Sequence, residues 1–481
     1  MTMMTLAEAA RLIDGAQQVG DGDVAFERVT TDSRQAAAGD LFVGLRGERF
    51  DGSDFAADVA RQGAEAAVLS RDPRQPGLSC LVVADTRLAL AQLAAGWRRR
   101  FSLPLVAVTG SNGKTTVKEM IAAIFTAAVG ASRCLATRGN LNNDIGVPLT
   151  LLRLTSAQQY AVVELGMNHP GETVLLASTA APTVALVNNA QREHQEFMTS
   201  VEAVALEHAS AIHALGEDGV AVFPADEPYS GIWRVAADTR RTLEFALLDA
   251  PQAGTSCARQ AAVRGCLMPD GALQVDTPAG QFALTLAAPG RHNARNALAA
   301  CAAALAAGVT LDAIAAGLAL FRPVSGRLQR FEAALAGIAG ATVIDDTYNA
   351  NPDSVRAAID VLAECARPRV LVLGEMGEVG DQGAAFHREV GAYARERGID
   401  ALFALGDATR VSWQAFGDDA GASCEPAHAA RGGAFATPEA LVAALVAAYG
   451  GEATVLVKGS RYMKMERVVD ALTLRAQAPA H

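Results

Sequence analysis

The chain has 481 residues and a formal net charge of −11, with 41 Lys and Arg against 52 Asp and Glu. Because nucleic-acid-binding proteins are usually basic or carry a basic face, this balance argues against a general nucleic-acid binder. Hydrophobic residues make up 51% of the chain and charged residues 19%, which excludes wholesale disorder. The length is enough for roughly three domains, each with a core of its own.

The start of the chain and its apolar stretches indicate a cytoplasmic protein. Residues 1–10 lack the cationic segment and apolar block of a secretory signal. The longest apolar run, 297–309, is shorter than the about 20 residues that a membrane span needs, so we expect no membrane insertion. The seven cysteines are scattered without a CxxC pair, which is typical of a reduced compartment.

Short β-branched runs alternate with alanine-rich helical stretches along most of the chain. The clearest strand candidates are residues 105–108, 160–164, 183–187, 369–373, 401–404 and 454–457. Strands separated by helices predict right-handed crossovers and largely parallel sheets, the α/β class. Proline-containing segments at 98–104 and 321–326 suggest two boundaries. We therefore predict a small N-terminal domain at 1–101, a central domain at 102–322 and a C-terminal domain at 323–481.

The segment 105–116 predicts a phosphate-binding loop. An apolar strand leads into a turn bracketed by Gly110 and Gly113, and a helix follows. Glycines let successive backbone N–H groups point at phosphate oxygens, and the helix adds its positive end. We expect Lys114 to contact the β- and γ-phosphates of ATP and Thr115 to bind Mg²⁺. The residues assigned to the phosphates are Thr109, Gly110, Ser111, Asn112, Gly113, Lys114, Thr115 and Thr116.

The spacing of this loop departs from the strict phosphate-loop pattern. Two residues, rather than four, separate Gly110 from Gly113. The alternative is an ordinary glycine-rich turn between a strand and a helix. The position of Lys114 favours the functional interpretation, because the 41 basic residues include only four lysines.

Two polar residues follow successive strand candidates and are predicted metal ligands. Glu164 ends the run 160–164, and a carboxylate at the carboxyl end of a parallel strand points into the ligand crevice. His194 follows the run 183–187 and would bind the metal or polarise a metal-bound phosphate. Mg²⁺ prefers oxygen ligands, so a hydrogen-bonded loop histidine is the alternative for His194.

These segments resemble the Mur ligase family. The motifs that carry the resemblance are TGxxGKTT at 109–116, ELG at 164–166, NNxxxxH at 188–194, GRHNxxNA at 290–297, SGRL at 325–328 and DDTYNANP at 345–352. They cover nearly the whole chain in the family's order. The resemblance implies an ATP-dependent amide ligase that uses Mg²⁺. It also implies a central ATPase-type parallel sheet, a Rossmann-like C-terminal domain and a small α/β N-terminal domain.

Within the family, three segments favour the branch that joins D-alanyl-D-alanine to UDP-N-acetylmuramoyl-tripeptide. They are DTYNANPDS at 346–354, LGEMGE at 373–378 and HREVG at 387–391. The implied reaction is a cytoplasmic step of peptidoglycan precursor synthesis that takes small-molecule substrates and no nucleic acid, and we expect a monomer. The alternatives are another amino-acid-adding Mur ligase, or a nucleotide switch that shares only the phosphate loop.

The resemblance also assigns the remaining site residues. The catalytic residues would be Lys114, Glu164, His194 and Arg327, with Arg327 reaching the γ-phosphate only when the last domain closes over the centre. Further ATP contacts would be Asn293 and Asn296 at adenine and Asp346 at the ribose or the domain interface. Substrate contacts would be Ser33, Arg34 and Arg46 for the nucleotide sugar, Asn142 and Asn143 for the peptide, and Tyr348, Asn349, Lys458, Ser460 and Arg461 on the last domain.

One feature of the family is missing from this sequence. Many members carry a central-domain lysine whose carbamate helps to hold a second Mg²⁺. Counting on from His194 without gaps places that lysine within 204–210, where there is none and His208 occupies the place. We expect either that Glu207 or His208 takes over the electrostatic role directly, or that the enzyme manages its second metal differently, in each case without any need for bicarbonate at this site. The alternative is that both are ordinary polar residues on a helix.

Overall fold

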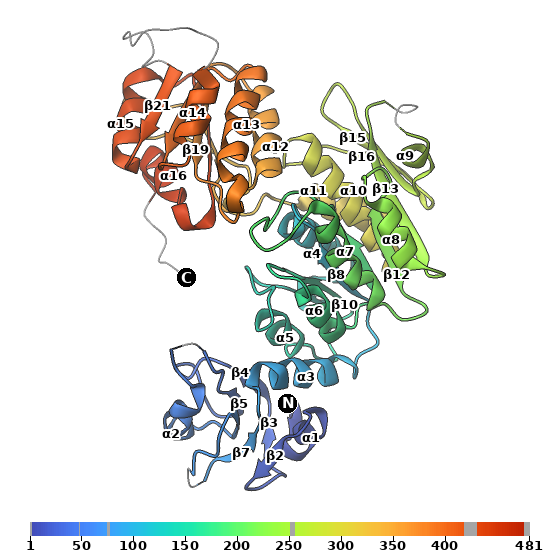
Figure 1. Cartoon of the computed structure of the whole chain (residues 1–481). Helices are drawn as coiled ribbons and strands as arrows, with labels where there is room; N and C mark the ends of the chain where they lie inside the picture. The colour runs from blue at the N-terminus through green and yellow to red at the C-terminus, as the bar shows by residue number, and fades with distance from the viewer. Residues whose placement is uncertain (1, 48, 75–76, 251–254, 418–430, 476–481) are drawn as a thin grey trace.

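The computed structural model describes residues 2–47, 49–74, 77–250, 255–417 and 431–475. Three main sheets follow one another along the chain, and helices lie against each of them (Figure 1). The predicted α/β class with largely parallel sheets is confirmed. The domain boundaries at 101 and 322 stay predictions. No helix of the described ranges is both long and apolar enough to cross a membrane.

The N-terminal part contains a five-stranded sheet in the order β2-β7-β6-β5-β4 and a small pair, β1-β3. Strands β4 to β7 are parallel, and β2 is antiparallel to β7. The strands are β1 (Met4–Thr5), β2 (Gln17–Val19), β3 (Ala25–Phe26), β4 (Arg28–Thr30), β5 (Asp40–Val43), β6 (Ala66–Leu69) and β7 (Ser79–Val82). The helices are α1 (Leu6–Leu12), α2 (Ala56–Arg61) and α3 (Thr86–Arg98).

The central part contains a nine-stranded sheet in the order β16-β15-β14-β13-β12-β11-β8-β10-β9. Its strands are β8 (Leu105–Thr109), β9 (Cys134–Ala136), β10 (Tyr160–Glu164), β11 (Val184–Val187), β12 (Val220–Pro224), β13 (Arg241–Leu248), β14 (Val263–Leu267), β15 (Leu273–Thr277) and β16 (Gly280–Leu284). Its helices are α4 (Lys114–Val129), α5 (Gly146–Leu151), α6 (Glu172–Ala180), α7 (Val201–His213), α8 (Ser230–Ala237), α9 (Ser256–Gln260), α10 (Arg291–Ala306) and α11 (Leu311–Leu320).

The order of the central strands creates the crevice for a ligand. Strands β8 to β14 are parallel, and β8 lies between β10 on one side and β11 on the other. The strands that follow β8 in the chain are therefore placed first on one side of it and then on the other. Ligands of such sheets bind at this point, beyond the carboxyl ends of the strands. All residues of β8 are buried, as expected for a parallel strand covered on both faces.

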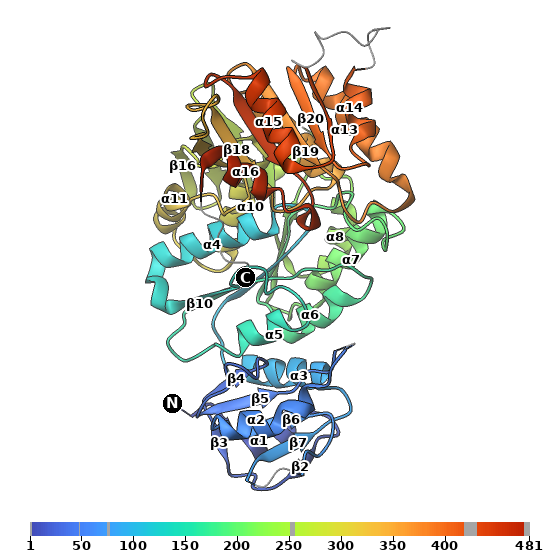
Figure 2. The same ribbon diagram turned by 90° about the vertical axis from the view of Figure 1, so that its left-hand side faces the viewer.

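Helices cover both faces of the central sheet. Helices α4, α10 and α11 share one core cluster, and α5, α6 and α7 belong to another. Gly317 of α11 lies against α4, where an added Cβ would collide with the backbone of Ile124. Helix α3 contributes to the same cluster as α5 and α6, so it packs between the N-terminal sheet and the central helices (Figure 2).

The C-terminal part contains a six-stranded sheet in the order β17-β18-β22-β19-β20-β21, parallel except for β17. Its strands are β17 (Gln329–Glu332), β18 (Thr342–Asp346), β19 (Arg369–Gly374), β20 (Ala401–Leu405), β21 (Gly432–Phe435) and β22 (Thr454–Lys458). Its helices are α12 (Pro352–Ala363), α13 (Gly383–Glu396), α14 (Arg410–Gly417), α15 (Pro438–Ala448) and α16 (Glu466–Thr473). Asn351 caps α12 by accepting a hydrogen bond from the Ser354 N–H group.

Candidate active site

The loop after β8 has the conformation that its glycines predict. Gly110 and Gly113 have φ angles of +130° and +81°, in the left-handed region that favours glycine. A Cβ added at Gly113 would lie 2.5 Å from Asn296 Oδ1 and 2.7 Å from Asn188 Nδ2. Asn188 Nδ2 donates to Asn296 Oδ1 at 2.9 Å and to the carbonyl oxygen of Asn112 at 2.8 Å. The loop is therefore held in shape by asparagine side chains packed directly beneath it.

Asn293 and Asn296, predicted to face adenine, both lie in the first turns of α10 and are buried. Asn296 Nδ2 donates to Asn293 Oδ1 at 3.2 Å, and Asn293 Nδ2 donates to the carbonyl oxygen of Pro289 at 2.8 Å. Both residues line the cavity above the loop. Their contact with adenine stays a prediction.

Lys114 begins α4, and its side chain curls back over the loop. Nζ donates to the carbonyl oxygen of Ser111 and to Glu193 Oε2, both at 3.2 Å, and it also contacts the carbonyl oxygen of Gly110. Loop N–H groups and the start of the helix favour an anion at the same place. A bound phosphate would therefore compete with these oxygen atoms for the ammonium group.

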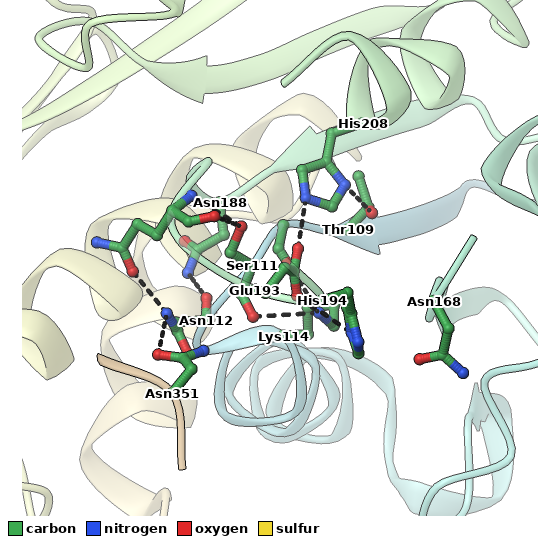
Figure 3. Close-up of polar contacts among 12 residues, drawn as sticks. Thr109, Ser111, Asn112, Lys114, Asn168, Asn188, Glu193, His194, His208 and Asn351 are labelled. Atoms are coloured by element: carbon green, nitrogen blue, oxygen red, sulfur yellow. Dashed lines mark hydrogen bonds and ion pairs between the residues drawn. The ribbon is translucent and has the colours of Figure 1, made fainter. Parts of the chain in front are cut away.

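Glu193 is a buried carboxylate that our sequence reasoning missed. It is 4% exposed and lines the cavity beside Lys114. Burial alone would raise the pKa of Glu193, but Lys114 and the histidines His208 and His194 lower it to about 2. The side chain is therefore ionised at neutral pH, and it lies between Lys114 and His208 (Figure 3). Its place directly before His194 was the only signal in the sequence.

Glu164 lies at the end of β10 and is 2% exposed. Its Oε1 accepts hydrogen bonds from Thr115 Oγ1 at 3.1 Å and from Asn142 Nδ2 at 2.8 Å. Its Oε2 is buried without a hydrogen-bond partner among the described residues. A buried carboxylate oxygen without a donor suits a cation, and the Thr115 hydroxyl supplies a second oxygen beside it. The residues present therefore fit Mg²⁺.

His194 lines the same cavity but is held by other carboxylates. Its Nδ1 lies 2.6 Å from Glu378 Oε2, and its Nε2 lies 3.7 Å from Glu193 Oε2. The backbone of His194 has a φ angle of +48°, an uncommon conformation for a residue other than glycine. Across the described ranges, no group of three or more His, Cys, Asp or Glu side chains is arranged to hold a metal ion. A Mg²⁺ ion here would need phosphate oxygens as further ligands, and the role of His194 stays a prediction.

The C-terminal part closes onto the phosphate loop. Arg327 Nη2 donates to Thr115 Oγ1 at 2.9 Å, and its guanidinium group lies 4.2 Å from the centre of the Tyr348 ring. Asn351 Nδ2 donates to Asn112 Oδ1 at 2.9 Å. Arg327 therefore lies beside the phosphate loop, and its contact with the γ-phosphate stays a prediction.

An ion pair between a buried lysine and a partly exposed aspartate lies on the C-terminal side of the cavity. Lys458 Nζ lies 2.6 Å from Asp346 Oδ2 and donates to the carbonyl oxygen of Asn349 at 2.9 Å. Ser460 Oγ is buried and has no hydrogen-bond partner within the described part of the chain, whereas Arg461 pairs with Glu466 at the surface. Asp346 is therefore tied to Lys458, and its contact with a ribose stays a prediction.

Most of the predicted site residues line one cavity of about 970 Å³. They are Ser111, Asn112, Gly113, Lys114, Thr115, Thr116, Asn142, Asn143, Glu164, His194, Asn293, Asn296, Arg327, Asp346, Tyr348, Asn349, Lys458, Ser460 and Arg461. Thr109 is buried beneath it at the end of β8, and Gly110 follows directly. The cavity therefore joins the phosphate loop to the C-terminal sheet.

The residues predicted to bind the nucleotide sugar lie in the N-terminal part. Arg34 forms an ion pair with Asp32 at 2.8 Å, and Ser33 lies between them in sequence. The Arg46 N–H group donates to Thr86 Oγ1 at 3.3 Å. None of the three predicted residues lines the cavity described above. Their substrate contacts stay predictions for a separate subsite.

The two candidates for the missing lysine have different surroundings. Glu207 accepts hydrogen bonds from the N–H groups of Gly171 and Thr173 at 2.9 and 2.8 Å, at the start of α6. His208 is fully buried and lies between Thr109 and Glu193. Of the two, only His208 is connected to the phosphate loop by these hydrogen bonds.

Three family models match successive stretches of the chain. They are the Mur ligase family, catalytic domain, at residues 25–98, the Mur ligase middle domain at 108–304 and the Mur ligase, glutamate ligase domain, at 326–461. The chain is 41% identical to the UDP-N-acetylmuramoyl-tripeptide–D-alanyl-D-alanine ligase of Escherichia coli, covering 98% of this chain and 99% of the relative. It is 35% identical to the Haemophilus influenzae ligase of the same name, with 98% and 99% covered.

Solved structures give the same result. A crystal structure of MurF from Acinetobacter baumannii is similar with a TM-score of 0.84 and 33% identity, covering 98% of both chains. The MurF ligase from Thermotoga maritima in complex with ADP is similar with a TM-score of 0.78 and 25% identity, covering 93% of this chain and 97% of that one.

Proposed function

The chain belongs to the Mur ligase family, and we propose that it forms the amide bond between UDP-N-acetylmuramoyl-tripeptide and D-alanyl-D-alanine through an acyl phosphate. The enzyme is an ATP-dependent ligase of peptidoglycan precursor synthesis, a step of cell-wall biogenesis. Relatives that carry this activity in their names are similar to this chain over nearly its whole length.

The acid has to be activated before an amine can attack it. ATP transfers its γ-phosphoryl group to the terminal carboxylate of the tripeptide and leaves as ADP. The amine of D-alanyl-D-alanine attacks the acyl phosphate, and the tetrahedral intermediate loses phosphate to give the amide. The protein contributes mainly by positioning the reactants and neutralising charge.

The observation that carries this proposal is the cavity between the phosphate loop and the C-terminal sheet. Lys114 and the loop N–H groups would hold the phosphates, and Arg327 would neutralise the γ-phosphate from the other side. The closed arrangement would also keep water away from the acyl phosphate, which is readily hydrolysed.

Magnesium is the metal that this cavity suits. The buried, unpartnered Glu164 Oε2 and the hydroxyl of Thr115 would hold it together with phosphate oxygens, and His194 would be a further ligand. The ion would neutralise charge that develops on the transferring phosphoryl group.

The substrates would occupy the cavity and a separate subsite in the N-terminal part. The N-terminal part, with Ser33, Arg34 and Arg46, would hold the nucleotide sugar, and Asn142 and Asn143 would hold the peptide. Lys458, Ser460 and Arg461 would face the dipeptide, with Ser460 Oγ buried and without a described partner. One chain supplies all of these residues, so we propose a monomer that works in the cytoplasm.

A coupled phosphate-release assay tests the proposal. The protein is mixed with ATP, Mg²⁺ and UDP-N-acetylmuramoyl-tripeptide, and D-alanyl-D-alanine is compared with free amino acids. We expect release with the dipeptide and at most a slow background with single amino acids. Release with a free amino acid but not with the dipeptide would assign the chain to another branch of the family. Tripeptides with different third residues then define the acceptor.

A further inference from the structure

A continuous chain of polar contacts runs from the end of β8 to the lysine of the phosphate loop. It passes from Thr109 through His208 and Glu193 to Lys114, and all four side chains are labelled in Figure 3. These residues come from β8, α7, the segment after β11 and the first turn of α4. The fold therefore brings four separate elements together at one carboxylate.

His208 uses both of its ring nitrogens in this chain. Nε2 lies 2.9 Å from Glu193 Oε1, and Nδ1 lies 2.9 Å from Thr109 Oγ1. An ionised carboxylate only accepts hydrogen bonds, so Nε2 donates to Glu193, and the Thr109 hydroxyl can donate to Nδ1. Since His208 is fully buried, its ring holds one oxygen of Glu193 in a fixed place.

The other oxygen of Glu193 faces the phosphate site. Oε2 lies 3.2 Å from Lys114 Nζ and 3.7 Å from His194 Nε2. ATP that binds at the loop brings phosphate oxygens to Lys114, so two anionic groups must then share one ammonium group. Like charges this close repel strongly in a site that excludes water. A divalent cation between the carboxylate and the phosphates removes this repulsion.

We propose that Glu193 is a carboxylate that binds a divalent cation beside the ATP phosphates, and that His208 is its positioning residue. The pair takes over the role for which the family resemblance implied a modified lysine, because no lysine lies between Lys118 and Lys458. Glu207 does not take this role, since its carboxylate caps α6. The inference rests on the proposed ATP-dependent function and adds a second cation position to that of Glu164 and Thr115.

ATP binding with and without Mg²⁺ tests the role of Glu193. Isothermal titration of the full-length protein with ATP, in Mg²⁺ or in EDTA and without the acid substrate, gives the factor by which Mg²⁺ strengthens binding. Glu193→Gln keeps the shape of the side chain and removes its charge. We expect the factor to fall roughly tenfold or more, as for the loss of a metal-supporting group. Affinity in EDTA should stay the same or rise, because Lys114 loses a competing anion.

The outcomes of this titration are distinct. An unchanged Mg²⁺ factor in Glu193→Gln would overturn the proposal, and so would an equal loss of affinity with and without Mg²⁺, which indicates a structural role. Glu202→Gln is the matched control, because Glu202 is an exposed glutamate at the start of α7. Phosphate release by the unmodified enzyme tests the proposed function separately. Failure of the proposed function can therefore be distinguished from failure of the proposal about Glu193.

Two variants test the positioning role of His208. His208→Gln retains an N–H donor for Glu193, whereas His208→Leu removes it. We expect the Mg²⁺ factor to decrease in the order unmodified enzyme, His208→Gln, His208→Leu, with little change in EDTA. His213→Ala, an exposed histidine on the same helix, is the control. Equal factors in the two His208 variants, or a gain in activity when bicarbonate is added to CO₂-depleted unmodified enzyme, would overturn the assignment.

Discussion

At the scale of single residues, the ammonium group of Lys114 is already in position to bind an anion. Its ammonium group already contacts two carbonyl oxygens of the loop and the Glu193 carboxylate. Binding ATP therefore exchanges some of these contacts for phosphate contacts, and the ammonium group is already in place when the phosphates arrive. A lysine suits this exchange because its charge is compact and its donors rotate freely, whereas the fixed fork of arginine needs a wider space.

Removing this ammonium group should leave the phosphoryl group without its cation. We expect Lys114→Ala to lower substrate-dependent phosphate release on the order of 100- to 1,000-fold, as for the loss of one strong charge-stabilising group. Lys464→Ala is the control, because Lys464 is an exposed lysine of the C-terminal part. The phosphate-release assay gives the rates, and thermal unfolding checks that both variants fold. Full activity in Lys114→Ala would contradict the assigned role.

The individual site residues differ in how far a single sequence predicts them. Glu164 ends an apolar run, and the carboxyl ends of parallel strands meet at one edge, so its place in the cavity followed from local pattern. Glu193 has no such pattern, because its importance comes from His208 on a helix that folds back against β8. Contacts of this kind depend on tertiary packing, and sequence spacing does not reveal them.

At the scale of elements, one arginine joins the central sheet to two C-terminal helices. Arg192 lies in the segment after β11, and its guanidinium group bonds Asp353 of α12 and Glu389 of α13, with closest distances of 2.6 Å to each. The ring of Phe386 lies 5.2 Å from the same group. Because Asn351 meets Asn112 directly before α12, this contact holds the helix against the phosphate loop.

Breaking this contact should weaken closure. Arg192→Ala leaves two carboxylates without their shared partner, which costs about 1–2 kcal/mol for a partly exposed bidentate pair. We therefore expect the KM for ATP to rise roughly tenfold with a smaller change in kcat. Steady-state kinetics with saturating tripeptide and dipeptide measures both constants. Arg410→Ala, which breaks the exposed Arg410–Asp407 pair, should change neither. An unchanged KM for ATP in Arg192→Ala would show that this contact does not contribute to nucleotide binding.

The elements that could be predicted were the buried parallel strands. The run 160–164 matches β10 in full, and 105–108, 369–373, 401–404 and 454–457 each end one residue before their strands do. Continuous apolar runs between helices are typical of such strands. The hairpin of β15 and β16 was not predicted, because β15 alternates buried and more exposed residues and β16 is a mostly exposed strand at the edge of the sheet. The residues of the turn and the neighbouring strands determine where such hairpin strands form, and the sequence shows no continuous apolar run at these positions.

At the scale of the whole molecule, an acidic chain has to bind anionic substrates. The net charge is −11, yet Lys114, Arg327, Arg295 and Lys458 all line the central cavity. Several of these cations are paired with carboxylates of the protein, as in Lys458 with Asp346. The positive charge is therefore local, and the overall balance predicts solubility and association rates more than binding at the site.

The same pairing of charges makes the closed arrangement sensitive to acid. Hydrogen bonds from Arg192 hold the pKa of the Glu389 carboxyl group below its ordinary value of 4.5, although partial burial opposes this. When folding lowers the pKa of a carboxyl group, the ionised group stabilises the folded arrangement at any pH above its ordinary pKa. This stabilisation is lost as the pH falls from the ordinary pKa through the lower pKa of the folded state. We therefore expect closure to be intact at neutral pH and to loosen below pH 4.5.

Small-angle scattering across this range measures the loosening as a rise in the radius of gyration, and far-UV circular dichroism confirms that the sheets remain folded. Glu389→Gln cannot titrate at this position, so its radius should already be larger at neutral pH and should change less on acidification. Identical pH profiles for the two proteins would show that other carboxylates control the opening. A radius that stays constant while both proteins remain folded would show that contacts such as Arg327 with Thr115 hold the C-terminal part in place without Glu389.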